Sequence, residues 1–139
     1  IDLMRHLLDS PFTDYSIQTA GRRPTSPIVI DDFVINIKFE DGSLGSINYF
    51  SKGSKQFSKE RIECFTEGRV IQLDNFQSLR TWDSGGKSTK RKLRQDKGHQ
   101  KCLSSFVDSL SDTADAYSIP LDEIFEATKI AIELSDQAK

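Results

Sequence analysis

The chain has 139 residues and a formal net charge of −2, with 36% apolar and 29% charged residues. This composition is typical of a soluble globular protein, and a nearly neutral molecule has no overall attraction to nucleic acid or to anionic membranes. No apolar run approaches the roughly 20 residues that cross a bilayer, and no signal peptide is present, so we expect a cytoplasmic protein.

The first part of the chain predicts a helix followed by a strand. Apolar residues at helical spacing occupy residues 1–8, and Asp9-Ser10-Pro11 ends that pattern. Because the chain begins inside this helix and without Met, we expect it to be a piece of a longer protein. Residues 13–20 predict a strand, residues 21–27 a surface loop, and residues 28–30 either a short strand or the approach to Asp31.

The stretch 31–74 predicts two β-hairpins. Phe33, Ile35, Ile37 and Phe39 alternate with mostly polar residues, which is the pattern of a strand with one buried face. Asp41-Gly42 and Glu67-Gly68 are turn dipeptides, and they separate strands 33–40 from 43–50 and 61–65 from 69–73. Two hairpins joined by the polar loop 51–60 predict one antiparallel sheet.

The last part of the chain predicts further extended structure and two helices. Residues 76–82 have extended character, and the basic stretch 87–97 is expected to be an exposed edge strand, because lysines at an edge discourage unwanted pairing. Residues 98–111 form one helix, and a second begins near Pro120. We expect the following residues on the inner faces of these helices: Cys102, Leu103, Phe106, Val107 and Leu110, then Ile124, Phe125, Thr128, Ala131, Ile132 and Ser135.

Grouped strands with helices at the ends of the chain indicate an α+β fold, in which an open, mainly antiparallel sheet is covered by helices on one face. The size predicts a single domain over residues 1–139. Cys64 and Cys102 lack metal-ligand spacing, and we expect two buried thiols rather than a disulfide.

Few residues point to chemistry. The sequence contains no Gly-rich phosphate loop, no catalytic elbow and no metal motif. His99 follows Asp96-Lys97-Gly98 at the start of a helix, where it either lines a cleft or packs locally. The loop 49–60 carries lysines and hydroxyls that suit a hydroxylated or phosphorylated ligand, although an ordinary solvated loop has the same composition.

The order of these elements resembles the C-terminal domain of the Gfo/Idh/MocA oxidoreductases. Residues 1–8 resemble the helix that follows the family's His-x-x-Asp motif, and residues 33–45 are similar to its strand–Asp-Gly-Ser–strand hairpin. Residues 58–70 resemble its second hairpin. Asp96-Lys97-Gly98-His99 and Ile119-Pro120, each leading into a helix, are similar to a branch that acts on sugars or sugar nucleotides.

The resemblance implies a glyceraldehyde-3-phosphate dehydrogenase-like C-terminal domain of a two-domain enzyme. An N-terminal Rossmann domain, absent from this chain, would hold NAD or NADP, and the enzyme would transfer hydride to or from a sugar, sugar nucleotide or cyclic polyol. If Asp2 is the Asp of the motif, the catalytic histidine lies just upstream of Ile1, so the chain alone contains no catalytic residue and binds no cofactor or metal.

The same resemblance implies substrate and protein partners. The expected substrate-binding residues, chosen for their place in loops, are Tyr49, Lys52, Lys55, Lys59 and His99. The expected partners are the chain's own Rossmann domain, a sugar-type small molecule and a second copy that pairs through the sheet face. Two alternatives, both ranked well below the oxidoreductase, are a non-enzymatic oligomerisation or ligand-binding module and a nucleic-acid binder that uses residues 87–97.

Overall fold

The computed structural model describes residues 1–20, 32–110 and 119–138, and its chain divides into two compact units. The first unit contains residues 1–53 and 119–139, and the second contains residues 54–118. The short strand considered for residues 28–30 lies outside the described residues. That the two units form one domain of a longer enzyme stays a prediction.

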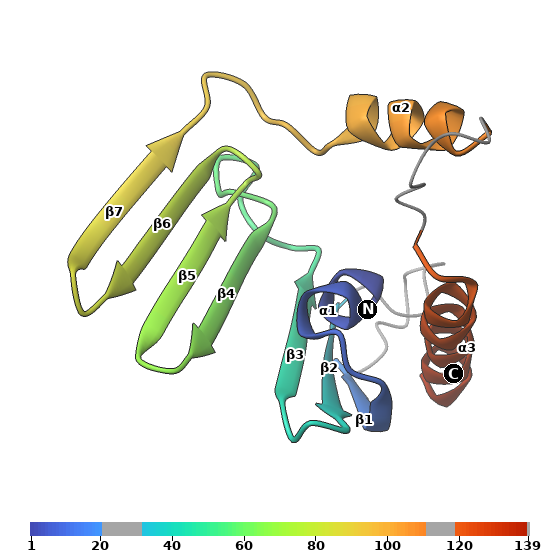
Figure 1. The fold of residues 1–139 in the computed structure, drawn as a ribbon. Coiled ribbons are helices and arrows are strands. Elements are labelled where there is room, and N and C mark those ends of the chain that lie inside the picture. The colour runs from blue at the N-terminus through green and yellow to red at the C-terminus, as the bar shows by residue number, and fades with distance from the viewer. Residues whose placement is uncertain (21–31, 111–118, 139) are drawn as a thin grey trace. The chain divides into compact units, whose positions relative to one another are not determined.

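The described residues of the first unit form two helices and a three-stranded antiparallel sheet (Figure 1). Its elements are α1 (Asp2–Leu8), β1 (Phe12–Thr19), β2 (Asp32–Phe39), β3 (Leu44–Phe50) and α3 (Leu121–Gln137). The strand order is β1-β2-β3, with Ile35 opposite Ile17 on one side and Ile47 on the other. The predicted Asp41-Gly42 turn is confirmed, since Gly42 has a φ of 87° and Asp41 Oδ1 accepts a 2.9 Å hydrogen bond from Ser43 N.

The core of the first unit lies between β2 and α3. Ile35, Ile37 and Phe39 point to one side of the sheet, as their alternation predicts, and they pack against Ile130 and Leu134 of α3. Phe39 and Leu134 are 1% and 2% exposed. The last helix of the chain therefore covers the sheet that its first half builds, as the grouping of strands and helices predicts.

The inner face expected for α3 was wrong. The buried residues are Ala127, Ile130 and Leu134, whereas Ile132 is 59% and Phe125 is 71% exposed. The other residues expected inside, Ile124, Thr128, Ala131 and Ser135, are also exposed. The helix carries two apolar stripes side by side, and packing against the sheet and α1 buries the stripe of Ala127, Ile130 and Leu134, so periodicity alone selected the wrong one.

Over residues 54–110 the second unit forms a four-stranded antiparallel sheet and one helix (Figure 1). Its elements are β4 (Arg61–Thr66), β5 (Arg69–Asp74), β6 (Ser78–Asp83), β7 (Gly86–Arg91) and α2 (His99–Ser109), with the strands paired in chain order. The turn at Glu67-Gly68 is confirmed, with both residues at positive φ. The basic edge strand predicted for residues 87–97 is confirmed in part: β7 pairs with β6 alone and all six of its residues are exposed, but it ends at Arg91 and residues 92–97 are not in a strand.

Three expectations for the second unit were wrong or incomplete. The α+β class with antiparallel strands is confirmed. The single sheet predicted from the two hairpins was wrong, because the described strands form two sheets: the β2–β3 hairpin pairs with β1, and the β4–β5 hairpin pairs with β6. The apolar stripe of α2 is exposed, with Leu103 68% and Phe106 64% accessible. The cysteines are free thiols, but they are not both buried, since Cys64 is half-buried and Cys102 lies on the exposed α2.

Candidate functional site

Two of the predicted binding residues belong to the first unit. Tyr49 is 53% exposed on β3 and stacks on Phe33, with ring centroids 5.1 Å apart and planes 15° apart. Lys52 forms an ion pair with Asp32, whose other oxygen accepts hydrogen bonds from the Ser51 amide and hydroxyl. The Lys52 hydrogen bond, followed by the Ser51 amide, lowers the pKa of Asp32. An aromatic platform and a lysine thus lie near one end of the β2–β3 ladder.

The other three predicted residues belong to the second unit. Lys55 and Lys59 are exposed in the loop before β4, and His99 is the first residue of α2. The loop and the approach to α2 are joined by a hydrogen-bonded ion pair between Lys97 Nζ and Glu60 Oε1, at 2.8 Å. The loop before β4 and the segment before α2 are therefore joined through Glu60 and Lys97, which lie close in sequence to Lys59 and His99.

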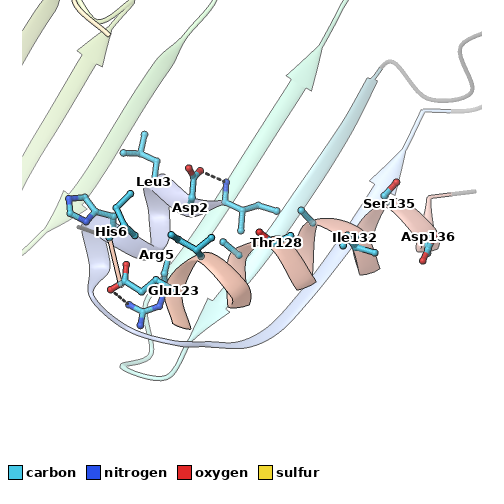
Figure 2. Close-up of a pocket in the computed structure, with 14 residues that line it drawn as sticks. Asp2, Leu3, Arg5, His6, Glu123, Thr128, Ile132, Ser135 and Asp136 are labelled. Carbon is cyan, nitrogen blue, oxygen red and sulfur yellow. Dashed lines mark ion pairs between the residues drawn. The ribbon is translucent and has the colours of Figure 1, made fainter. Parts of the chain in front are cut away.

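A groove of about 750 Å³ lies between α1 and α3 in the first unit (Figure 2). Leu3 and His6 on α1 are at one end, and Ser135 and Asp136 on α3 are at the other. Much of the wall is apolar and includes the exposed stripe of α3 described above. The lining residues are Ile1, Asp2, Leu3, Arg5, His6, Ile119, Glu123, Ile124, Ala127, Thr128, Ala131, Ile132, Ser135 and Asp136.

A buried arginine holds the end of this groove together. The Nε of Arg5 donates a 2.9 Å hydrogen bond to Glu126 Oε2, and Glu126 Oε1 accepts a 2.9 Å bond from the Phe12 amide. The Nη1 atom of Arg5 lies 3.8 Å from carboxylate oxygens of Glu123 and of Asp9. Burial acts to lower the pKa of Arg5, but the Glu126 hydrogen bond and the neighbouring carboxylates outweigh it and raise the pKa.

Sequence reasoning missed Arg5 and the glutamates of α3. The available signal was an arginine placed between the apolar positions Met4 and Leu8, together with glutamates flanking the stripe that is buried. A cation inside an apolar pattern requires a buried partner, and α3 supplies it from more than 100 residues away. The arrangement is structural in character, because the three nearby carboxylates already balance the guanidinium.

The wall of the α1–α3 groove is mainly apolar. Among the described residues, no group of three or more His, Cys, Asp or Glu side chains is arranged to hold a metal ion. Within the same residues, no helix is long and apolar enough to span a membrane. None of the five predicted binding residues lines the groove, whereas Asp2, which the resemblance would make the Asp of the His-x-x-Asp motif, does.

The fold defines a class of protein: an α+β chain with two antiparallel sheets in which α1 packs against α3, the first and last of the described helices. No protein-family model matches the sequence, and no curated protein is significantly similar to it. Solved structures do match. A candidate oxidoreductase from Thermotoga maritima has a TM-score of 0.75 and 12% identity, over 99% of this chain and 41% of its own.

The second structure is UDP-N-acetylglucosamine 3-dehydrogenase GnnA from Acidithiobacillus ferrooxidans. It also has a TM-score of 0.75, with 11% identity over 96% of this chain and 42% of its own. At such low identity the likeness establishes the fold, and it confirms the fold resemblance to the C-terminal part of these oxidoreductases. The chain spans about two fifths of the length of each of these proteins.

Proposed function

We propose that this chain is the C-terminal domain of an NAD(P)-dependent, cytoplasmic oxidoreductase of the Gfo/Idh/MocA family. In this role it binds the substrate, which is a sugar, sugar nucleotide or cyclic polyol, and contributes to oligomerisation. The observation that carries the proposal is the fold match, with a TM-score of 0.75, to a UDP-N-acetylglucosamine 3-dehydrogenase over nearly the whole chain.

The chain's own residues do not fit the dinucleotide. The sequence lacks the Gly-x-Gly-x-x-Gly turn that brings a helix N-terminus to a pyrophosphate. The nicotinamide supplies or accepts the hydride when it is bound to the enzyme, and in the proposal a separate Rossmann domain holds it. The contribution of this chain is to bind and orient the substrate.

The test is to assay the longer polypeptide that joins this chain to a Gly-rich Rossmann domain. With UDP-N-acetylglucosamine, other sugar nucleotides, free sugars and inositols, and with NAD or NADP, we expect the absorbance of reduced nicotinamide to rise with one substrate class. The 139-residue chain alone should give no calorimetric signal with either dinucleotide. Absence of a Rossmann partner, or absence of turnover across the panel, would overturn the proposal.

Two substitutions test the predicted binding residues within that longer enzyme. Lys59→Ala and His99→Ala are expected to raise KM or to lower kcat, because the side chains would meet substrate hydroxyls or phosphate. Lys129→Ala is the matched control, since Lys129 is an exposed lysine on α3 outside the predicted set. Kinetics equal to those of the control would remove Lys59 and His99 from the site.

A non-enzymatic oligomerisation module is the second candidate function. It is favoured by two exposed apolar surfaces, the α2 stripe of Leu103, Phe106, Val107 and Leu110 and the wall of the α1–α3 groove. Sedimentation of the 139-residue chain separates the candidates when it is combined with the turnover assay. A stable oligomer with no turnover of the longer polypeptide favours the module.

A further inference from the structure

Positive charge is concentrated in the second unit. Residues 54–110 contain twelve Lys and Arg and seven Asp and Glu, a formal charge of +5, whereas the whole chain carries −2. In and after β7, two lysines are paired with carboxylates, Lys92 with Asp96 and Lys97 with Glu60. Four other cations there have no carboxylate partner among the described residues: Lys87, Lys90, Arg91 and Arg94. The nearly neutral chain therefore includes a local surface that attracts anions.

Strand pairing places two aromatic rings beside this basic strand, although residues 87–97 contain no aromatic residue. One row of directly paired residues crosses all four strands of the sheet and projects from one face, and its members are Phe65, Val70, Trp82 and Lys87. Phe65 is 74% exposed, and Lys87 Nζ lies 5.4 Å from the centre of the Trp82 ring. The strand register thus brings aromatic and cationic side chains together.

The other two rows of the same face, which we call the basic face, add more cations than free carboxylates. They contribute three arginines: Arg61, Arg80 and Arg91. Both carboxylates of these rows already have partners. Glu63 Oε1 accepts a 2.6 Å hydrogen bond from Gln72 Nε2, and Asp74 Oδ2 lies 3.5 Å from Arg61 Nη2. The basic face is therefore positive as a whole.

The opposite face of the sheet has a different character. It carries the apolar residues of the same strands: Ile62, Cys64, Ile71, Leu73 and Leu79. An antiparallel sheet commonly packs one face against apolar neighbours and leaves the other face in solvent. Because the apolar face is suited to packing, the basic face is the one that remains for a charged ligand.

We propose that the basic face binds single-stranded nucleic acid. Cations attract the phosphates, and exposed aromatic rings stack with bases that are not already stacked in a duplex. Phe65 offers an open ring. On Trp82 a base can replace the Lys87 ammonium, which then pairs with a phosphate. An acidic peptide or an anionic lipid would use the cations but would leave both rings without a stacking partner.

This inference goes beyond the proposed function, and neither depends on the other. Turnover is measured with sugar substrates and a nicotinamide, whereas binding to the basic face is measured with oligonucleotides, so failure of one test leaves the other valid.

The experiment titrates the 139-residue chain with oligouridylate and oligothymidylate of roughly ten nucleotides at low salt. Trp82 is the only tryptophan of the chain, so its fluorescence reports on the basic face. We expect saturable quenching that a duplex of the same length does not reproduce, because its bases already stack on one another. Affinity should fall as salt rises, with a log–log slope of about −0.7 for each phosphate contact.

Variants separate stacking from charge when binding is followed by the anisotropy of a labelled oligonucleotide. Phe65→Ala should weaken binding by about tenfold, as expected for loss of one stacked base, and Phe65→Tyr, which keeps a ring, should bind normally. Lys87→Ala should weaken binding and reduce the salt slope by about 0.7. Lys129→Ala, an exposed lysine of α3, is the matched control and should bind as the unmodified chain does. Because Phe65 and Lys87 are exposed, these variants should keep the fold.

Three outcomes would overturn the proposal. The first is the absence of saturable binding at low salt. The second is equal binding of polyphosphate or polyglutamate with no effect of Phe65→Ala, which would indicate a general anionic partner. The third is tighter binding to phosphatidylserine vesicles than to the oligonucleotides, which would indicate a membrane surface.

Discussion

Arg5 and Glu126 stand 121 positions apart in the chain and are joined by a 2.9 Å hydrogen-bonded ion pair. The same carboxylate accepts the Phe12 amide through its second oxygen, so one glutamate of α3 holds both α1 and the start of β1. Helices α1 and α3, near the two ends of the chain, therefore belong to the same unit. The stability of that unit depends on contacts between residues that are far apart in the sequence.

Removal of the Arg5 guanidinium should destabilise the first unit. In Arg5→Met, Glu126 keeps the hydrogen bond from the Phe12 amide but loses its cationic partner while it remains largely covered, since its side chain is 26% exposed. We expect the free energy of unfolding to fall by about 2–3 kcal/mol, below the range for fully buried pairs because of this exposure. Denaturant unfolding measures the change.

The matched control for this prediction is Lys129→Met. Lys129 faces Glu133 one helical turn away at 3.9 Å and is 74% exposed, so its loss should cost about 0.5 kcal/mol or less. Equal effects of the two substitutions would show that the Arg5 pair is no stronger than a surface pair.

The orientation of α3 predicts opposite outcomes for two neighbouring aliphatic residues. Leu134→Ala should cost about 2–5 kcal/mol, because it leaves a cavity against Ile37 and Phe39. Ile132→Ala should change the free energy of unfolding by about 0.5 kcal/mol or less, because Ile132 is already 59% exposed. Thermal and denaturant unfolding of both variants measures these changes. A larger loss of unfolding free energy for Ile132→Ala than for Leu134→Ala would show that the face of α3 carrying Ile132 is the buried one.

Acid should weaken the β2–β3 end of the sheet through Asp32. Its pKa is lowered from 3.8 by the hydrogen bond from Lys52 and then by the Ser51 amide. Its contribution to stability is therefore complete above the unfolded pKa of 3.8 and is lost as the pH falls through the lower folded value. In Lys52→Met we expect the Asp32 pKa, measured by carboxyl NMR, to rise toward 3.8, and in Lys38→Met, an exposed lysine of β2, to stay unchanged.

Alkali should weaken the contact between β1 and α3 through Tyr15. The Tyr15 hydroxyl donates to Glu133 Oε2, and this bond, followed by burial, raises the tyrosine pKa above 10.0. The contribution to stability is complete below 10.0 and is lost as the pH rises through the higher folded value. In Glu133→Gln the Tyr15 pKa should fall toward 10.0 in an isotope-resolved titration, and no change would show that the carboxylate is not responsible.

Local pattern was sufficient for much of this fold. The alternation of Phe33, Ile35, Ile37 and Phe39 predicted both a strand and its buried face. Side chains of a strand alternate between two faces, so when only one face is apolar, that face must be the buried one. The turn dipeptides Asp41-Gly42 and Glu67-Gly68 located the hairpins, since few other residues adopt positive φ without strain. The exposed basic strand β7 followed from its lysines.

The buried face of α3 and the side-chain pairs between distant residues depend on the tertiary structure. Both apolar stripes on α3 have a helical period, and packing against the sheet and α1 buries Ala127, Ile130 and Leu134. No local pattern could pair Arg5 with Glu126 or place Ser78 opposite Asp74, because these contacts arise from the path of the chain between them. Local pattern alone therefore specified most of the strands and helices and their turns, whereas packing and strand register determined which face of α3 is buried and which charged groups pair.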